Sequence, residues 1–117
     1  SRKGNAALGP LVIKASAGTL YRAPLLLCAA LPEGLAACRE GGMEICTLEA
    51  QAALSLFDYR PHSHSVFVLG NETSGVSAAV SELADQALAI PMNNGVESLN
   101  VAVTASLIAF ANAMGQR

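Results

Sequence analysis

The residues best suited to chemistry follow an apolar stretch near the middle of the chain. After Ser65-Val-Phe-Val-Leu69 the sequence reads Gly70-Asn71-Glu72-Thr73-Ser74-Gly75-Val76-Ser77. The spacing of Gly70 and Gly75 matches the first part of a phosphate-binding loop, but Val76 stands where that loop requires lysine. Glu72 would also bring a carboxylate against phosphate, so nucleoside triphosphate binding is disfavoured. A carboxylate at the mouth of an apolar strand makes Glu72 a candidate for acid–base work or for orienting a ligand.

A second polar loop runs from Ile90 to Asn100 and leads into the last apolar segment. Ser98 is predicted to cap the last helix, which would leave Asn100 in the first turn with its amide available to the loop or to a ligand. Both loops follow predicted strands and end at predicted helix N-termini. Because the carboxyl ends of parallel strands share one edge of a sheet, we expect the two loops to lie side by side there.

The elements that must position these loops alternate between short apolar runs and helical segments. We expect strands over Ala23–Ala30, Met43–Leu48, Ser65–Leu69 and Gln86–Pro91, and helices over Pro10–Gly18, Pro32–Gly41, Ala50–Phe57, Ser77–Ala84 and Ser98–Met114. This alternation predicts an α/β fold in which helices sandwich a mainly parallel sheet.

Composition limits the classes of protein to which this chain can belong. Its 117 residues, 52% of them hydrophobic, predict one globular domain. A net charge of −2 gives no global positive field for nucleic acid, and we expect no DNA partner. Three cysteines without metal-ligand spacing are expected to be buried free thiols. The longest apolar run, 101–111, is too short to span a membrane, and without a signal segment we expect a cytoplasmic protein.

The last helical segment is apolar on more than one face. Val101, Val103, Leu107, Ile108 and Phe110 do not fall on a single stripe. We therefore expect this helix to be covered on two sides, by the core on one side and by a second subunit on the other.

The two loops together resemble the last two motifs of the SpoU/TrmH-type RNA 2′-O-ribose methyltransferases of the SPOUT superfamily. Phe67–Ser77 corresponds to the first of these motifs and Ile90–Val103 to the second, and Lys14–Gly18 resembles the segment that precedes them. The resemblance covers nearly the whole chain. It implies a SPOUT-type domain with a C-terminal trefoil knot, S-adenosyl-L-methionine as cofactor, and a homodimer.

The resemblance also implies which residues serve the site. The cofactor pocket would be lined by Leu69, Gly70, Ile90, Met92 and Leu99, and Thr47 would approach the adenosine from the end of the preceding strand. Glycine at position 70 would leave room for the cofactor. The catalytic positions of the family correspond to Glu72, Ser98 and Asn100, which would position the ribose and hold the active site together.

The reaction that the resemblance implies is attack of a ribose 2′-oxygen of tRNA or rRNA on the sulfonium methyl group. It needs in-line alignment and loss of a proton, but no metal. A further family motif, a strand followed by an Asn and by a helical Arg that is usually proposed to activate the hydroxyl, would lie upstream of Ser1. We therefore expect residues 1–117 to be a single SPOUT domain without that motif. The alternative is a non-catalytic SPOUT-like module that binds cofactor or RNA and dimerises.

Overall fold

The computed structural model describes residues 1, 8–71, 73–93 and 99–115. They divide into two compact units, Ser1–Gly34 and Leu35–Arg117. The first unit contains helix α1 (Pro10–Ala15) and the short 3-10 helix η1 (Thr19–Tyr21). Pro10 begins α1 because its fixed φ suits the first helical position and its missing N–H has no partner there. In the ranges that the structure describes, no helix is long and apolar enough to cross a membrane.

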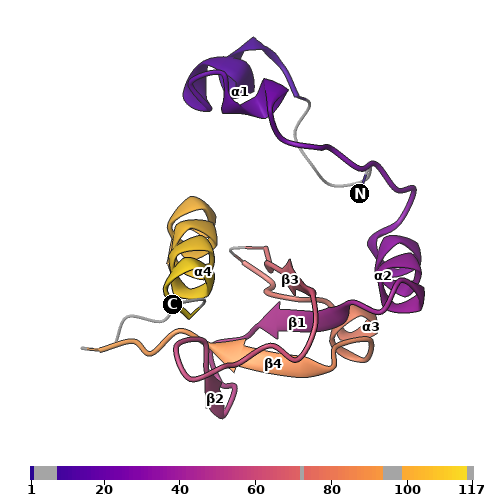
Figure 1. Cartoon of the computed structure of the whole chain (residues 1–117), viewed down its shortest axis with the longest axis vertical. Helices are drawn as coiled ribbons and strands as arrows, with labels where there is room; N and C mark the ends of the chain where they lie inside the picture. Colours follow the sequence, from indigo (N-terminus) through magenta and orange to yellow (C-terminus); the bar gives the residue numbers. More distant parts are fainter. Residues whose placement is uncertain (2–7, 72, 94–98, 116–117) are drawn as a thin grey trace. The chain divides into compact units, whose positions relative to one another are not determined.

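The second unit is built on a four-stranded parallel sheet (Figure 1). Its strands are β1 (Glu44–Leu48), β2 (Leu54–Ser55), β3 (Ser65–Val68) and β4 (Gln86–Ala89), and their spatial order is β2-β4-β1-β3. All three strand pairs are parallel, which confirms the predicted α/β class. Since β3 and β4 lie on opposite sides of β1, the chain between them, including α3 (Ala78–Ser81), crosses over β1.

Strand β1 is buried on both faces because its side chains alternate between two covered layers. Cys46 joins a core with Leu56, Tyr59 and Leu88, to which helix α4 (Val101–Gly115) contributes Ile108. Ile45 and Thr47 point to the opposite face and are also 0% exposed. Strand β1 is thereby held between two covered faces as well as between its two neighbouring strands.

One buried polar cluster is embedded in the core beside β1. The Cys46 thiol donates to the Tyr59 hydroxyl over 3.3 Å, and the Tyr59 hydroxyl donates to Glu44 over 2.7 Å. Ser65 supplies a further contact to the same hydroxyl at 2.9 Å. Burial is the main cause that raises the pKa of both the Cys46 thiol and the Tyr59 hydroxyl above their ordinary values. Both groups are therefore neutral and structural at physiological pH.

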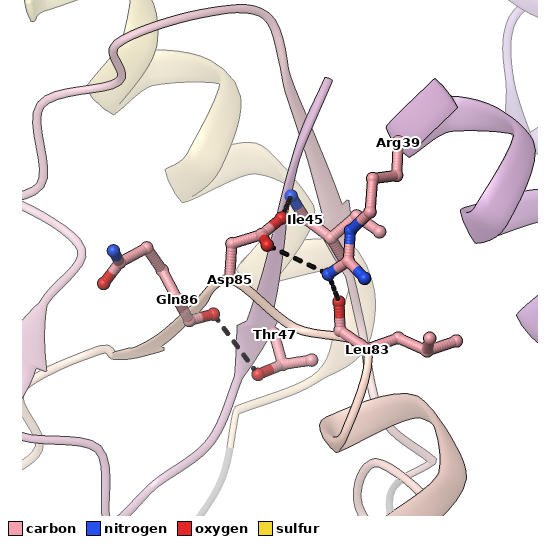
Figure 2. Close-up of polar contacts among 6 residues, drawn as sticks. All are labelled: Arg39, Ile45, Thr47, Leu83, Asp85 and Gln86. Atoms are coloured by element: carbon pink, nitrogen blue, oxygen red, sulfur yellow. Dashed lines mark hydrogen bonds and ion pairs between the residues drawn. The ribbon is translucent and has the colours of Figure 1, made fainter. Parts of the chain in front are cut away.

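An aspartate clamps the beginnings of β1 and β4 together (Figure 2). Asp85 accepts a hydrogen bond from the Ile45 N–H through Oδ2 (2.8 Å), and its own N–H donates to the Ile45 carbonyl (2.8 Å). Its other oxygen, Oδ1, pairs with Arg39 of helix α2 (Leu31–Glu40) at 2.9 Å. Arg39 also donates to the carbonyl of Leu83. Asp85, which directly precedes β4, thus joins the beginning of β4 to the beginning of β1 and to helix α2.

The predictions of local structure were wrong in two segments. Ala23–Ala30 forms no strand, and Leu26 within it is 92% exposed. The described sheet contains only the strands β1, β2, β3 and β4, so residues 23–30 have no hydrogen-bonded strand beside them and stay irregular. Residues 50–57 are not a helix either, because Leu54 and Ser55 pair with Leu88 and Ala89 of β4. That pairing partner lies more than thirty residues away and leaves no local pattern.

Other elements differ in extent from their predictions. Helix α3 is shorter than Ser77–Ala84, and α4 begins at Val101 rather than at Ser98. All three cysteines are free, but only Cys46 is fully buried, whereas Cys28 and Cys38 are half-buried. The expectation that all three thiols are buried was therefore wrong for two of them.

The first prediction concerns the hydrogen bond that Asp85 accepts from the Ile45 N–H. Asp85→Ala should lower the free energy of unfolding by about 1–3 kcal/mol, because it leaves the partly buried Ile45 N–H without its acceptor. Arg39→Ala should cost less than about 1 kcal/mol, since the ion pair is exposed on both sides. Urea unfolding of the two variants measures the difference. Asp85→Asn, which keeps an acceptor oxygen, is the control, and an Arg39→Ala loss equal to that of Asp85→Ala would contradict this account.

Candidate functional site

A cavity of about 240 Å³ lies at the carboxyl ends of β1, β3 and β4. Its size is near the lower end of small-molecule sites, which measure roughly 300–1,000 Å³. The walls come from the residues that follow each strand and from the beginning of α4: Leu48, Glu49, Ala50, Leu69, Gly70, Asn71, Gly75, Leu88, Ile90, Met92, Leu99, Val101 and Thr104. The predicted meeting of the two loops at one edge of the sheet is therefore what the structure shows.

Five of the six residues predicted to bind a cofactor line this cavity: Leu69, Gly70, Ile90, Met92 and Leu99. Thr47 does not. It is 0% exposed, and its hydroxyl donates to the Glu49 carboxylate over 2.8 Å, with the Gln86 carbonyl farther away at 3.5 Å (Figure 2). Thr47 lies inside the buried strand, whereas Leu48 is the last residue of β1 and Glu49 follows it, and these two residues line the cavity instead.

The loop after β3 closes on itself through its backbone. Asn71 and Gly75 exchange two hydrogen bonds, of 2.9 and 2.8 Å, and the Asn71 side chain accepts from the Thr73 N–H. A Cβ at Gly70 would lie 2.5 Å from the backbone carbon of Gly75. Close packing of the turn against itself thus requires glycine at position 70. Gly70 also lines the cavity, and its predicted role of leaving room for a cofactor stays a prediction. Glu72 lies outside the described residues.

The beginning of α4 is capped by Asn100. Its side-chain oxygen accepts from the Ala102 N–H at 2.9 Å, and its backbone carbonyl accepts from the Thr104 N–H at 2.9 Å. Asn100 is therefore the N-cap, the position predicted for Ser98, and its amide oxygen is occupied by the helix. Ser98 lies outside the described residues. Leu99, Val101 and Thr104, on either side of this cap, face the cavity.

Sequence reasoning missed Glu49, the one charged side chain among the cavity-lining residues that the structure describes. It is half-buried, and its Oε1 accepts from two hydroxyls, Thr47 at 2.8 Å and Ser81 of α3 at 3.0 Å. The signal that identifies it is its position, since an acidic residue directly after a buried strand lies where open parallel sheets bind ligands.

The chemistry of the cavity is mainly apolar with a few polar groups at its margin. Seven aliphatic side chains and Met92 supply the walls, whereas Glu49, Asn71 and Thr104 supply hydrogen-bonding groups. This arrangement suits a ligand with a flat or apolar part and a hydroxylated part. Within the described ranges no three His, Cys, Asp or Glu side chains are grouped so as to hold a metal ion.

The chain is similar to known RNA-modifying proteins over most of its length. Residues 1–110 match the model of the SpoU rRNA Methylase family. A 23S rRNA (adenosine(1067)-2'-O)-methyltransferase of Streptomyces laurentii is 37% identical over 97 residues, which are 82% of this chain and 36% of the relative. A 23S rRNA (guanosine-2'-O-)-methyltransferase RlmB of a Burkholderia species is 30% identical over 93% of this chain and 44% of its own length. The chain thus spans about two fifths of these relatives.

Solved structures share the fold. The SpoU methyltransferase AviRb of Streptomyces viridochromogenes, solved in complex with the cofactor AdoMet, superposes with a TM-score of 0.83 at 25% identity. The match covers 96% of this chain and 46% of that one. The similarity extends over the strands and loops that form the cavity described above.

The second prediction concerns the close packing of the loop after β3 at Gly70. Gly70→Ala should lower the free energy of unfolding by about 3 kcal/mol, because the new methyl group meets backbone that must shift. Gly75→Ala should cost only about 1 kcal/mol, since its φ is +65° but the space beside it is open. Urea unfolding compares the two. Equal losses would show that the close contact at Gly70 is not what requires glycine there.

Proposed function

The chain belongs to the SpoU rRNA Methylase family, and from that premise we propose that it carries the cofactor site of an S-adenosyl-L-methionine-dependent 2′-O-ribose methyltransferase acting on tRNA or rRNA. The observation that supports the proposal most is the cavity at the carboxyl edge of the sheet, which is lined by five residues that the family resemblance assigns to the cofactor. The relatives named above supply the substrate class. Both are named as 2′-O-methyltransferases of 23S rRNA.

The residues of the cavity fit the proposed cofactor. Leu88, Ile90 and Met92 offer an apolar wall for an adenine ring, and the backbone of the Gly70 loop offers polar groups to the rest of the molecule. When bound, S-adenosyl-L-methionine supplies an electrophilic methyl group on a sulfonium centre. What this chain contributes is orientation, because a displacement of this kind depends on alignment of the two reacting groups.

We assign the handling of the RNA ribose to Glu72, Ser98 and Asn100. For Asn100 the structure adds a chemical restriction. Its side-chain oxygen is held by the Ala102 N–H, so the amide nitrogen, which has no hydrogen-bond partner among the described residues, is the part left for a ribose oxygen. Helix α4 thereby fixes the direction in which Asn100 donates.

The family's trefoil knot and homodimer are further parts of this proposal. Helix α4 supports the dimer, because it packs Leu107, Ile108 and Ala111 against the core and leaves other apolar side chains outside. Val103, Phe110 and Met114 are 47%, 69% and 75% exposed. A second copy of the chain would cover this outer face, as the apolar pattern of the helix predicts.

Substitution of Asn100 tests the catalytic assignment. Asn100→Ser keeps a good helix cap and should fold like the parent, but it should transfer methyl groups at least about tenfold more slowly because the amide donor is gone. Asn100→Ala loses the cap as well, at about 0.5–2 kcal/mol. The measurements are transfer from labelled S-adenosyl-L-methionine to unmodified tRNA and rRNA by the whole protein, and thermal unfolding.

Two results would count against this assignment. Full activity of Asn100→Ser would leave Asn100 with capping alone. If the parent binds S-adenosylhomocysteine in a calorimetric titration yet methylates no RNA, the non-catalytic cofactor-binding module is the correct interpretation.

Substitution of Phe110 tests the dimer. Phe110→Lys places a charge on the outer face of α4 and should convert the dimer to a monomer at micromolar concentration, as measured by light scattering. Phe57→Lys is the matched control, since Phe57 is 47% exposed but lies outside α4, and it should leave the dimer intact. A dimer that survives Phe110→Lys would place the interface elsewhere.

A further inference from the structure

Glu49 is held in a fixed orientation by two hydroxyls that belong to different elements. Thr47 of β1 and Ser81 of α3 both donate to its Oε1, over 2.8 and 3.0 Å. The Glu49 N–H also donates to the Leu88 carbonyl at 2.9 Å, so the backbone at this position is fixed to β4. Two hydroxyl donors and a fixed backbone thus set the direction of the carboxylate. They leave Oε2 without a hydrogen-bond partner among the described residues.

The topology of the sheet places Glu49 between two groups of cavity-lining residues. Strand β1 lies between β4 and β3, so the residue after β1 lies between those that follow the other two strands. On the β4 side are Leu88, Ile90 and Met92, and on the β3 side are Gly70 and Asn71. A ligand that extends from the apolar residues to the glycine loop would therefore lie along the part of the cavity to which Glu49 belongs.

The order of groups in an adenosyl cofactor matches this order of residues. Its apolar base and its amino-acid part are joined through a ribose, and a ribose carries two neighbouring hydroxyl donors. A carboxylate oxygen without a partner is a strong acceptor for such a hydroxyl, and hydrogen bonds to a charged acceptor are shorter and stronger than neutral ones.

We propose that Glu49 is the ribose-binding residue of the cavity, accepting a hydrogen bond from a 2′- or 3′-hydroxyl of the adenosyl cofactor through Oε2, and that Thr47 and Ser81 are positioning residues that aim it. This inference rests on the proposed function, because it takes the adenosyl group as the ligand. It also gives Thr47, which does not line the cavity, a part in the site through its contact with Glu49.

A cycle of protein and ligand variants tests the proposal by calorimetry. S-adenosylhomocysteine and its 2′-deoxy and 3′-deoxy analogues are titrated into the parent, Glu49→Gln and Glu40→Gln. Glu49→Gln should bind S-adenosylhomocysteine about tenfold more weakly than the parent. In the parent, one deoxy analogue should bind about tenfold more weakly than S-adenosylhomocysteine. In Glu49→Gln, the same analogue and S-adenosylhomocysteine should bind equally well, because the hydrogen bond that the analogue lacks is already lost in the variant. Glu40→Gln is the charge-matched control outside the cavity and should bind like the parent.

Ser81→Ala provides a second variant that keeps the carboxylate. It removes one of the two donors to Oε1, and it should weaken S-adenosylhomocysteine binding by about two- to threefold while reducing the penalty for the same deoxy analogue. Ser81→Thr, which restores a hydroxyl, should recover the parent affinity. Circular dichroism of each variant checks that the fold is retained.

The other outcomes separate this inference from the proposed function. If the parent binds S-adenosylhomocysteine and Glu49→Gln binds it equally well, the inference is wrong and the cofactor site stands. If Glu49→Gln weakens S-adenosyl-L-methionine but not S-adenosylhomocysteine, Glu49 acts on the sulfonium charge, and the ribose assignment is wrong. If the parent binds neither compound, the proposed function fails and the inference with it.

Discussion

The position of β1 between two parallel neighbours, with both of its faces buried, is the constraint on which the site depends. β3 and β4 pair with β1 on its two sides, and Ile45, Cys46 and Thr47 are 0% exposed. With all strands running the same way, the loops after β1, β3 and β4 must emerge at one edge. Segments of sequence some twenty residues apart thus form a single cavity. The clamp at Asp85 fixes the opposite end of the same strand pair.

Prediction from the sequence succeeded where the pattern was local, or where the parallel direction of the strands implied which loops meet. The apolar strand before Gly70 and the short one before Ile90 were enough to predict that their loops meet, and the cavity contains both. It failed where the deciding contact was distant. Leu54 and Ser55 are extended because of β4, and nothing in residues 50–57 encodes that partner. At Thr47 and Glu49 the failure was one of position along the chain, because Thr47 lies inside the buried strand β1 whereas Glu49 follows its last residue and reaches the cavity.

Two residues of the proposed site also have structural roles that their positions in the motifs do not indicate. Asn100 caps α4 with its side-chain oxygen, so the helix and any ligand share one amide group. Gly70 is required by the backbone of Gly75, since the turn packs too closely for a Cβ. Neither fact follows from residue type alone, because an N-cap two residues earlier and a glycine facing the ligand were equally compatible with the sequence. Asn100 and Gly70 thus both line or adjoin the site and stabilise the local backbone.

The close packing at Gly70 also bears on how a site of this kind diversifies. Gly70 and Gly75 have no side chain to offer the cavity, so what they contribute is main chain, and Gly70 has no room for a Cβ. Substitutions that alter ligand preference are therefore expected at lining positions that carry side chains, such as Leu88, Ile90 and Met92, rather than at Gly70. Variation in a site of this kind is confined by the packing of its own turn.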